Sequence, residues 1–86
     1  MSYTLRLLPS AQKEFLQLPP ALRAAVGRRF DELCINPRPP GAEALAGQLR
    51  GQLRVRVRDH RVVYYIEDPT REVFVTRVRP RSQAYK

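Results

Sequence analysis

The sequence is poor in cysteine and histidine, and this shortage excludes several classes of protein. Its single cysteine, Cys34, cannot form an internal disulfide bond, so the core must be stable without covalent cross-links. Because Cys34 and His60 are the only residues of their types, the chain lacks the set of ligands that a zinc site requires. We therefore predict neither a metal site nor a cofactor.

Common catalytic motifs are also missing. The sequence contains no phosphate-binding glycine loop, no HExxH pair and no nucleophile elbow. Its carboxylates are scattered, with Asp31 and Glu32 in one segment, Glu43 in another and Asp68 in an expected turn. This distribution argues against phosphoryl transfer that depends on a bound magnesium ion.

Charged residues interrupt the amino-terminal region before a long apolar run can form. Arg6, Lys13 and Glu14 stand among its hydrophobic residues, so we predict neither a signal peptide nor a membrane span. We expect a cytoplasmic protein without membrane contact. A length of 86 residues allows one domain, residues 1–86, and 43% hydrophobic with 28% charged residues is typical of a folded chain.

Arginine is the residue that the sequence has in excess. Sixteen Lys and Arg residues oppose eight Asp and Glu residues, which gives a formal net charge of +8, and fourteen of the sixteen are arginine. Residues 50–86 contain ten of the basic and four of the acidic residues, a net charge of +6. Such a field favours a polyanionic partner, either nucleic acid or an acidic protein, and the guanidinium group suits phosphate in particular.

Hydrophobic periodicity predicts a strand and two helices in the first part of the chain. Loose alternation over Tyr3–Leu8 indicates a strand that stops at Pro9. Ser10 is the expected amino-terminal cap of a helix that Pro19-Pro20 ends, and Pro20 can open the next helix. The apolar stripe of this second helix consists of Leu22, Val26, Phe30 and Leu33.

Prolines separate the helices from the remaining strands. The segment Asn36–Gly41 contains three prolines and cannot continue a helix, and residues 42–50 are expected to place an apolar turn against the domain. From Leu53 the period changes to two, which predicts strands over 53–58, 61–67 and 72–79, a tight connection at Asp59-His60 and a polar tail over 80–86. The predicted fold is α+β, with the order β-α-α-β-β-β and two antiparallel helices on one face of a mostly antiparallel four-stranded sheet.

Alternating arginines on the last three strands form a candidate binding surface. Arg54, Arg56 and Arg58 leave one face of their strand, because successive side chains of a strand alternate. A meander of three strands can bring them together with further arginines, and such a concentration repels itself unless an anion compensates. The other residues of this group are Arg61, Arg77, Arg79 and Arg81, with Tyr64, Tyr65 and Tyr85 between or after them.

The remaining candidates for chemistry each have a structural alternative. His60 is the only imidazole, but its expected place at a hairpin turn favours a structural role. Cys34 and Tyr64 are expected to pack in the core or on the sheet, and Arg71 is expected to be a solvated turn residue. Tyr85 lies near a polar carboxyl terminus without a packing pattern, so it is the better catalytic candidate.

The ordered series of motifs resembles toxins of the RelE/ParE superfamily, the toxic half of type II toxin–antitoxin pairs. The similarity covers nearly the whole chain, and the series is specific although each motif alone is weak. The motifs are the strand at Tyr3, Ala11-x-Lys13, Leu16-x-Leu18-Pro19, Asn36–Gly41, Leu45-x-Gly47, the run Leu53–Tyr64, and Arg79-x-Arg81 with Tyr85. The fold that the resemblance implies agrees with the fold predicted from the pattern.

The resemblance is closer to the RelE-like members, which cleave messenger RNA in the ribosomal A site without a metal ion. The positions that the family uses for this cleavage fall on Arg54, Arg56, Arg61, Arg81 and Tyr85. We expect further RNA contacts from Arg58, Arg77, Arg79 and His60. Two departures stand out, because Arg54 and Arg56 occupy positions that are often lysine and His60 replaces a common tyrosine.

The implied chemistry is attack of a 2′-hydroxyl group on the adjacent phosphate, with Arg61 and Arg81 stabilising the charge that develops. Arg54 and Arg56 hold their protons too tightly to act as bases, which leaves Tyr85, with His60 in reserve. The implied partners are the ribosome, messenger RNA and an acidic antitoxin, in a hetero-oligomer that binds operator DNA through the antitoxin. Two alternatives remain open: a ParE-like inhibitor of DNA gyrase, and a nucleic-acid-binding module without catalysis.

Overall fold

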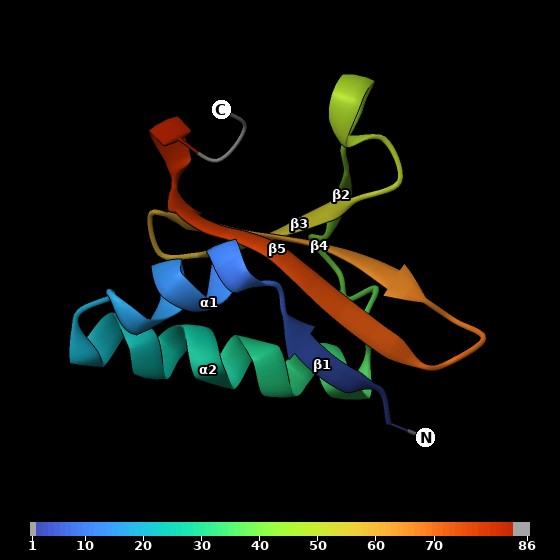
Figure 1. Ribbon diagram of the computed structural model, residues 1–86, viewed down its shortest axis with the longest axis horizontal. Coiled ribbons are helices and arrows are strands. Elements are labelled where there is room, and N and C mark those ends of the chain that lie inside the picture. Colours follow the sequence, from blue (N-terminus) through green and yellow to red (C-terminus); the bar gives the residue numbers. More distant parts are fainter. Residues whose placement is uncertain (1, 84–86) are drawn as a thin grey trace.

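The computed structural model of the protein describes residues 2–83. Its strands are β1 (Thr4–Leu7), β2 (Glu43–Ala44), β3 (Leu53–Val57), β4 (His60–Glu67) and β5 (Glu72–Pro80), its helices are α1 (Pro9–Leu16) and α2 (Pro20–Ile35), and two short 3₁₀ helices are η1 (Gly47–Leu49) and η2 (Arg81–Gln83). Both helices lie on one side of the sheet, and η1 and η2 project on the other side (Figure 1). The predicted α+β class and the two-helix layer are therefore confirmed.

The sheet has five strands in the order β1-β5-β4-β3-β2. Strand β1 runs parallel to β5, and the other neighbouring strands are antiparallel. The four predicted strands are all present, and the fifth, β2, pairs its two residues Glu43 and Ala44 with Arg54 and Leu53. A strand of two residues has no measurable period, so the pattern of the sequence does not reveal it.

Several element boundaries differ by one residue from the predicted ones. The amino-terminal cap of α1 is Leu8 rather than the predicted Ser10, because proline is tolerated at the first helical position and the helix begins at Pro9. The hydroxyl of Ser10 instead donates a hydrogen bond to the backbone carbonyl of Thr76, at 3.2 Å. The connection between β3 and β4 is Arg58-Asp59, so His60 is the first residue of β4 rather than a turn residue.

The hydrophobic core lies between the helices and one face of the sheet. Alternate residues of β3 and β4 face the helices, because side chains alternate along a strand, and one extra residue of β5, Thr76, shifts the alternation between Val75 and Val78. The prediction that Tyr64 packs in the core is confirmed, whereas Cys34 is only partly buried. The core cluster consists of Ala11, Val26, Phe30, Leu33, Val55, Val57, Val62, Tyr64, Val73, Val75 and Val78.

Hydrogen bonds fasten the proline-rich segment after α2 to the sheet. The hydroxyl of Tyr64 donates to the backbone carbonyl of Pro37 at 2.7 Å, and burial raises the pKa of Tyr64 to about 12. Arg38 donates two hydrogen bonds to Asp68, at 3.2 Å and 2.8 Å, and Tyr3 donates a third at 2.7 Å. These contacts hold the pKa of Asp68 down at about 2 and tie the start of β1 and the β4–β5 turn to the segment.

We predict that Tyr64→Phe lowers the free energy of unfolding by about 1 to 3 kcal/mol, because the buried carbonyl of Pro37 loses its donor. Denaturation by urea measures the change. The matched control is Tyr65→Phe, which removes the same hydroxyl from the neighbouring residue, whose half-buried ring lies on the opposite face of the sheet. Equal free energies of unfolding for the two variants would contradict the role of the Tyr64 hydroxyl.

Candidate functional site

The face of the sheet that points away from the helices carries a group of arginines on β3, β4 and β5. Strand register places Arg56, Arg61 and Arg79 in one row across the three strands. The next row contains Arg54, Val63 and Arg77. The predicted meander therefore brings the arginines together. We call Arg54, Arg56, Arg61, Arg77 and Arg79 the arginine face.

The residues of the arginine face differ in exposure. Arg61 is 4% exposed, whereas Arg56 is exposed to solvent. A buried guanidinium group has few accessible rotamers, so Arg61 presents its charge from a restricted position. Val63 is fully buried between Arg54 and Arg77 in its row, which fits the tendency of arginine stems to cover apolar surface.

Two carboxylates from outside the meander neutralise part of this charge. Glu43 on β2 forms an ion pair with Arg54, with 2.9 Å between a carboxylate oxygen and a guanidinium nitrogen. Only 14% of the Arg54 side chain is exposed. Glu14 on α1 accepts the Nε–H of Arg79 at 2.5 Å and the backbone N–H of Val78 at 2.8 Å. Strand β1 pairs with β5 only as far as Val75, so Glu14 caps the edge of β5 beyond that point.

Two further arginines, Arg58 and Arg81, lie at the end of the arginine face that is formed by the β3–β4 turn and η2. Arg58 is exposed in the turn between β3 and β4, where its backbone φ of 54° is left-handed. Arg81 is exposed at the start of η2, and its backbone N–H donates to the carbonyl of Asp59 at 2.8 Å. This bond brings the residue after β5 to the β3–β4 turn. Arg71 is exposed at the opposite end of the sheet, in agreement with its interpretation as a solvated turn residue.

His60 lies on the helix side of the sheet, although it lines one cavity together with Arg79 of the arginine face. His60 shares a row with Val57 and Pro80, and Val57 belongs to the core cluster on the helix side of the sheet. The cavity has a volume of about 240 Å³ and is lined by residues of α1 and β5 as well, and the Nδ1 of His60 lies 2.9 Å from a carboxylate oxygen of Asp59. This hydrogen bond lowers the pKa of Asp59. Tyr85, the other candidate for proton transfer, lies outside the described residues.

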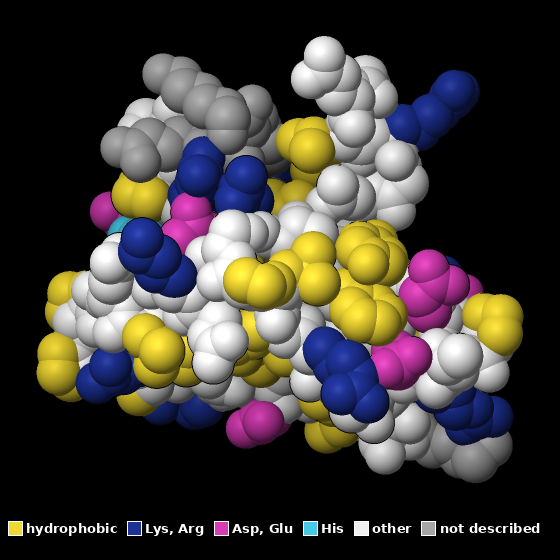
Figure 2. Space-filling view, in the orientation of Figure 1, with side chains coloured by type: hydrophobic (Ala, Val, Ile, Leu, Met, Phe, Trp, Pro, Cys, Tyr) yellow, Lys and Arg dark blue, Asp and Glu magenta, His cyan; other side chains and the backbone are white. Residues whose placement is uncertain are grey.

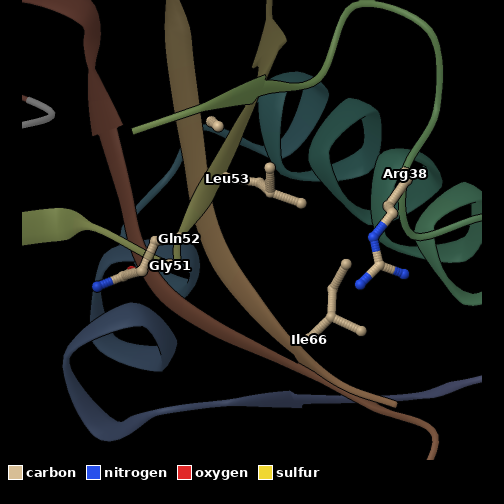
Figure 3. Close-up of a pocket in the computed structure, with 6 residues that line it drawn as sticks. Arg38, Gly51, Gln52, Leu53 and Ile66 are labelled. Atoms are coloured by element: carbon tan, nitrogen blue, oxygen red, sulfur yellow. The ribbon is translucent and has the colours of Figure 1, made fainter. Parts of the chain in front are cut away.

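A second cavity, of about 190 Å³, lies between the proline-rich segment and β3 (Figure 3). Leu53 and Ile66 line it, and both pack against the core on the helix side of the sheet. Arg38 points from its loop toward Ile66 in Figure 3, but its guanidinium group is paired with Asp68. Because its one cation is paired and its floor is apolar, this cavity is a weaker anion site than the arginine face.

Other site classes find little support in the described part of the chain. Between residues 2 and 83, no three His, Cys, Asp or Glu side chains group closely enough to hold a metal ion. None of the helices in that range has the length and apolar character that crossing a membrane requires. Sequence reasoning did not find Glu14 or Glu43, because neither belongs to a motif and both depend on contacts between distant segments.

Comparison with known proteins gives consistent similarities over almost the whole chain. The sequence model of the family described as "ParE toxin of type II toxin-antitoxin system, parDE" matches residues 5–85. Toxin RelG of Mycobacterium tuberculosis is 32% identical over 87 residues, which cover 100% of this chain and 99% of that protein.

Solved structures show the same likeness. The toxin-antitoxin complex RelBE2 from Mycobacterium tuberculosis contains a chain with a TM-score of 0.85 and 29% identity, over 94% of this chain and 100% of that one. The intact RelBE toxin-antitoxin complex of E. coli contains one with a TM-score of 0.80 and 26% identity, over 92% of this chain and 96% of that one.

We predict that Glu43→Gln raises the affinity for a short single-stranded 2′-O-methyl RNA about two- to fivefold, because Glu43 and a phosphate compete for Arg54. The matched control is Asp31→Asn, which changes the net charge equally but lies at an exposed position of α2, on the other side of the sheet. Fluorescence anisotropy measures both affinities. If the two variants gain affinity equally, net charge alone accounts for the gain and Glu43 does not screen Arg54.

Proposed function

Because the chain belongs to the ParE toxin family of type II toxin–antitoxin systems, within the RelE/ParE superfamily, we propose that it is a metal-independent endoribonuclease that cleaves messenger RNA in the ribosomal A site. The observation that supports this proposal is the arginine face. Strands β3 and β4 place Arg54, Arg56 and Arg61 on one surface, and Arg81 follows β5 at its end. These are four of the five positions that the resemblance assigns to cleavage.

In the proposed reaction the 2′-oxygen of one nucleotide forms a bond to the adjacent phosphorus. The bond from phosphorus to the 5′-oxygen breaks, which leaves a cyclic phosphate and a 5′-hydroxyl group. Negative charge rises on the phosphate oxygens in the transition state, and cations held in place around them lower the barrier. We assign this role mainly to Arg61, which burial restrains, and to the exposed Arg81.

The ion pairs of the arginine face support this assignment by limiting side-chain freedom. Glu43 holds Arg54 and Glu14 holds Arg79, so two cations on the strands beside β4 have defined orientations. Cations that are already oriented need no reorganisation when the charge of the transition state develops. Exposed Arg56 and Arg58 remain at the rim, where they can meet the incoming RNA backbone.

The reaction also needs a group that removes the 2′-hydroxyl proton and one that protonates the leaving oxygen. Arginine is a poor base near neutral pH, so Arg54 and Arg56 act by favouring the ionised form of a neighbouring hydroxyl group. We propose that Tyr85 exchanges the proton or stacks on a base. His60 is the weaker candidate, because its side chain lies among residues of α1 and β5.

We predict that Arg81→Gln reduces mRNA cleavage about 100-fold, because the phosphate loses one positioned donor. Primer extension on translating ribosomes maps and quantifies the cut. Arg28→Gln is the matched control, since Arg28 is an exposed arginine of α2, on the other side of the sheet, and this variant should retain the parental rate. Because Arg61 is buried, Arg61→Gln is informative only with its free energy of unfolding measured alongside.

The same cleavage map separates the two candidates for proton transfer. Tyr85→Phe should lower the single-turnover rate more than His60→Ala does. A fully active Tyr85→Phe beside an inactive His60→Ala would assign proton transfer to His60. A fully active Arg81→Gln would show that the phosphate is stabilised elsewhere.

One observation favours a second function. The family model that matches residues 5–85 is that of ParE toxins, and ParE-like members poison DNA gyrase through a protein interface. Inhibition of gyrase supercoiling by the purified chain, with no cut in the ribosomal cleavage map, would support this alternative. Salt-sensitive RNA binding without cleavage and without gyrase inhibition would instead indicate a plain nucleic-acid-binding module.

The proposed partner is an acidic antitoxin segment that covers the arginine face or its rim. Two of the similar solved structures are toxin-antitoxin complexes, and a net charge of +8 attracts an acidic chain. Charge alone gives weak specificity, so the segment should also contain an amphipathic helix that folds on binding. Through the antitoxin, such a hetero-oligomer would bind operator DNA.

We predict that amide hydrogen exchange of this complex shows protection at β3, at the β3–β4 turn and at η2, where the arginines concentrate. Exchange of the free chain and of the complex, measured at equal pH and temperature, gives the comparison. Protection confined to α2, with cleavage still blocked, would contradict direct coverage and would indicate that the antitoxin excludes the toxin from the ribosome by its bulk.

A further inference from the structure

The open face of the sheet continues beyond the arginine face into a pair of stacked aromatic rings. Tyr65 on β4 and Phe74 on β5 are directly paired residues, and their ring centroids lie 5.1 Å apart with an interplanar angle of 18°. Arg6 on β1 is the next residue in the same row. We call Tyr65 and Phe74 the aromatic pair.

The aromatic pair is not part of the hydrophobic core. Both rings are half-buried, and neither belongs to the core cluster or to the hydrophobic residues that pack against it. Their strand neighbours Tyr64, Val73 and Val75 are fully buried on the helix side. Figure 2 shows apolar side chains gathered over the sheet in this view, with basic and acidic side chains on either side. The rings therefore form a partly exposed apolar surface in a charged surrounding.

The charge of the side chains on this face changes from positive at one end of β4 and β5 to negative at the other. The row beyond the aromatic pair contains Glu67 and Glu72, and Arg6 pairs with Glu72 and lowers the pKa of that carboxyl. In the other direction come the row of Arg54 and Arg77 and then the row of Arg61. Alternate residues of a strand are about 7 Å apart, a step comparable with that between successive nucleotides of an extended strand.

We propose that the aromatic pair is a stacking platform for one base of a single RNA strand whose phosphates lie along the arginine face. Every base has an apolar face that stacks on aromatic side chains, and single-stranded RNA is commonly bound in this way. The inference rests on the proposed function only for the source of the strand, which would be messenger RNA.

Charge favours a base over an acidic protein segment at this position. The exposed Glu67 lies beside the aromatic pair and repels an acidic chain, whereas a neutral base has no such penalty; the charge of Glu72 is offset by its ion pair with Arg6. The carboxylate of Glu67 also keeps phosphates away from this end of the sheet. The strand would therefore place its backbone on the arginines and direct a base toward the aromatic pair.

The test compares two uncleavable probes of equal length and charge. One is a 2′-O-methyl hexanucleotide, which lacks the attacking hydroxyl group, and the other is the same backbone without bases. We expect the parental chain to bind the base-bearing probe about tenfold more tightly. Tyr65→Leu and Phe74→Leu should each reduce this preference several-fold, while the salt dependence of binding stays unchanged because the phosphate contacts remain.

Two further variants keep the result interpretable. Tyr65→Phe retains a ring and should retain the preference for bases. Tyr65→Trp introduces the only tryptophan of the chain, and its fluorescence should be quenched by the base-bearing probe but not by the backbone alone, even if the leucine variants fail to fold. Equal affinity of the parental chain for both probes, or an undiminished preference in folded leucine variants, would overturn the proposal.

These outcomes are distinguishable from failure of the proposed function. A base preference that depends on Tyr65, in a chain that cuts no ribosome-bound mRNA, would sustain the platform and reject the nuclease. Normal cleavage with an unchanged preference in Tyr65→Leu would reject the platform alone. Leucine variants that lose antitoxin affinity but keep the preference for bases would assign the aromatic pair to a protein interface and overturn the proposal.

Discussion

The structure depends on one constraint, the burial of alternate apolar residues of β3, β4 and β5 beneath the two helices. Val55, Val62 and Val78 lie in the same row across these strands and are almost completely buried. Burying each such side chain contributes about 1.5 to 3 kcal/mol, and a register slip of one residue would bring charged neighbours into the core instead. The arginines share one face because the valines between them must share the other.

This arrangement creates an electrostatic problem that neighbouring elements partly solve. Arg56 and Arg61 are directly paired across two strands, where like charges destabilise a sheet. Glu43 and Glu14 reach the arginine face from β2 and α1, and each pairs with one flanking arginine. The tertiary contacts that complete the fold thus also set how much positive charge an anion meets.

The sequence predicted those parts of the fold that have a period. Both helices and the three long antiparallel strands contain enough residues for periods of 3.6 and two to be recognised, whereas β2 contains only two residues. His60 shows how an error of one residue in a strand boundary changes the expected position of a side chain. A turn that ends at Asp59 makes His60 the first residue of β4 and points it toward α1, because neighbouring residues of a strand face opposite sides.

For the candidate site too, the sequence predicted the features that follow from strand alternation but not those that depend on tertiary contacts. The strand-borne arginines follow from alternation and a meander, so their convergence could be expected from their spacing. The burial of Arg61 and the pairing of Glu14 with Arg79 arise from packing between segments that are distant in sequence. No local pattern encodes such contacts. The same holds for the aromatic pair, whose two members belong to different strands.

The order of chemical groups along the open face bears on both proposed activities. Arginines, aromatic rings and carboxylates follow one another along β4 and β5, so the two ends of this face attract different partners. A partner that covers the arginine end would block phosphate binding whether the cellular target is RNA or another macromolecule. Neutralisation by an antitoxin therefore does not reveal the target. The aromatic pair does discriminate, because a base recognises its rings and a phosphate backbone alone does not.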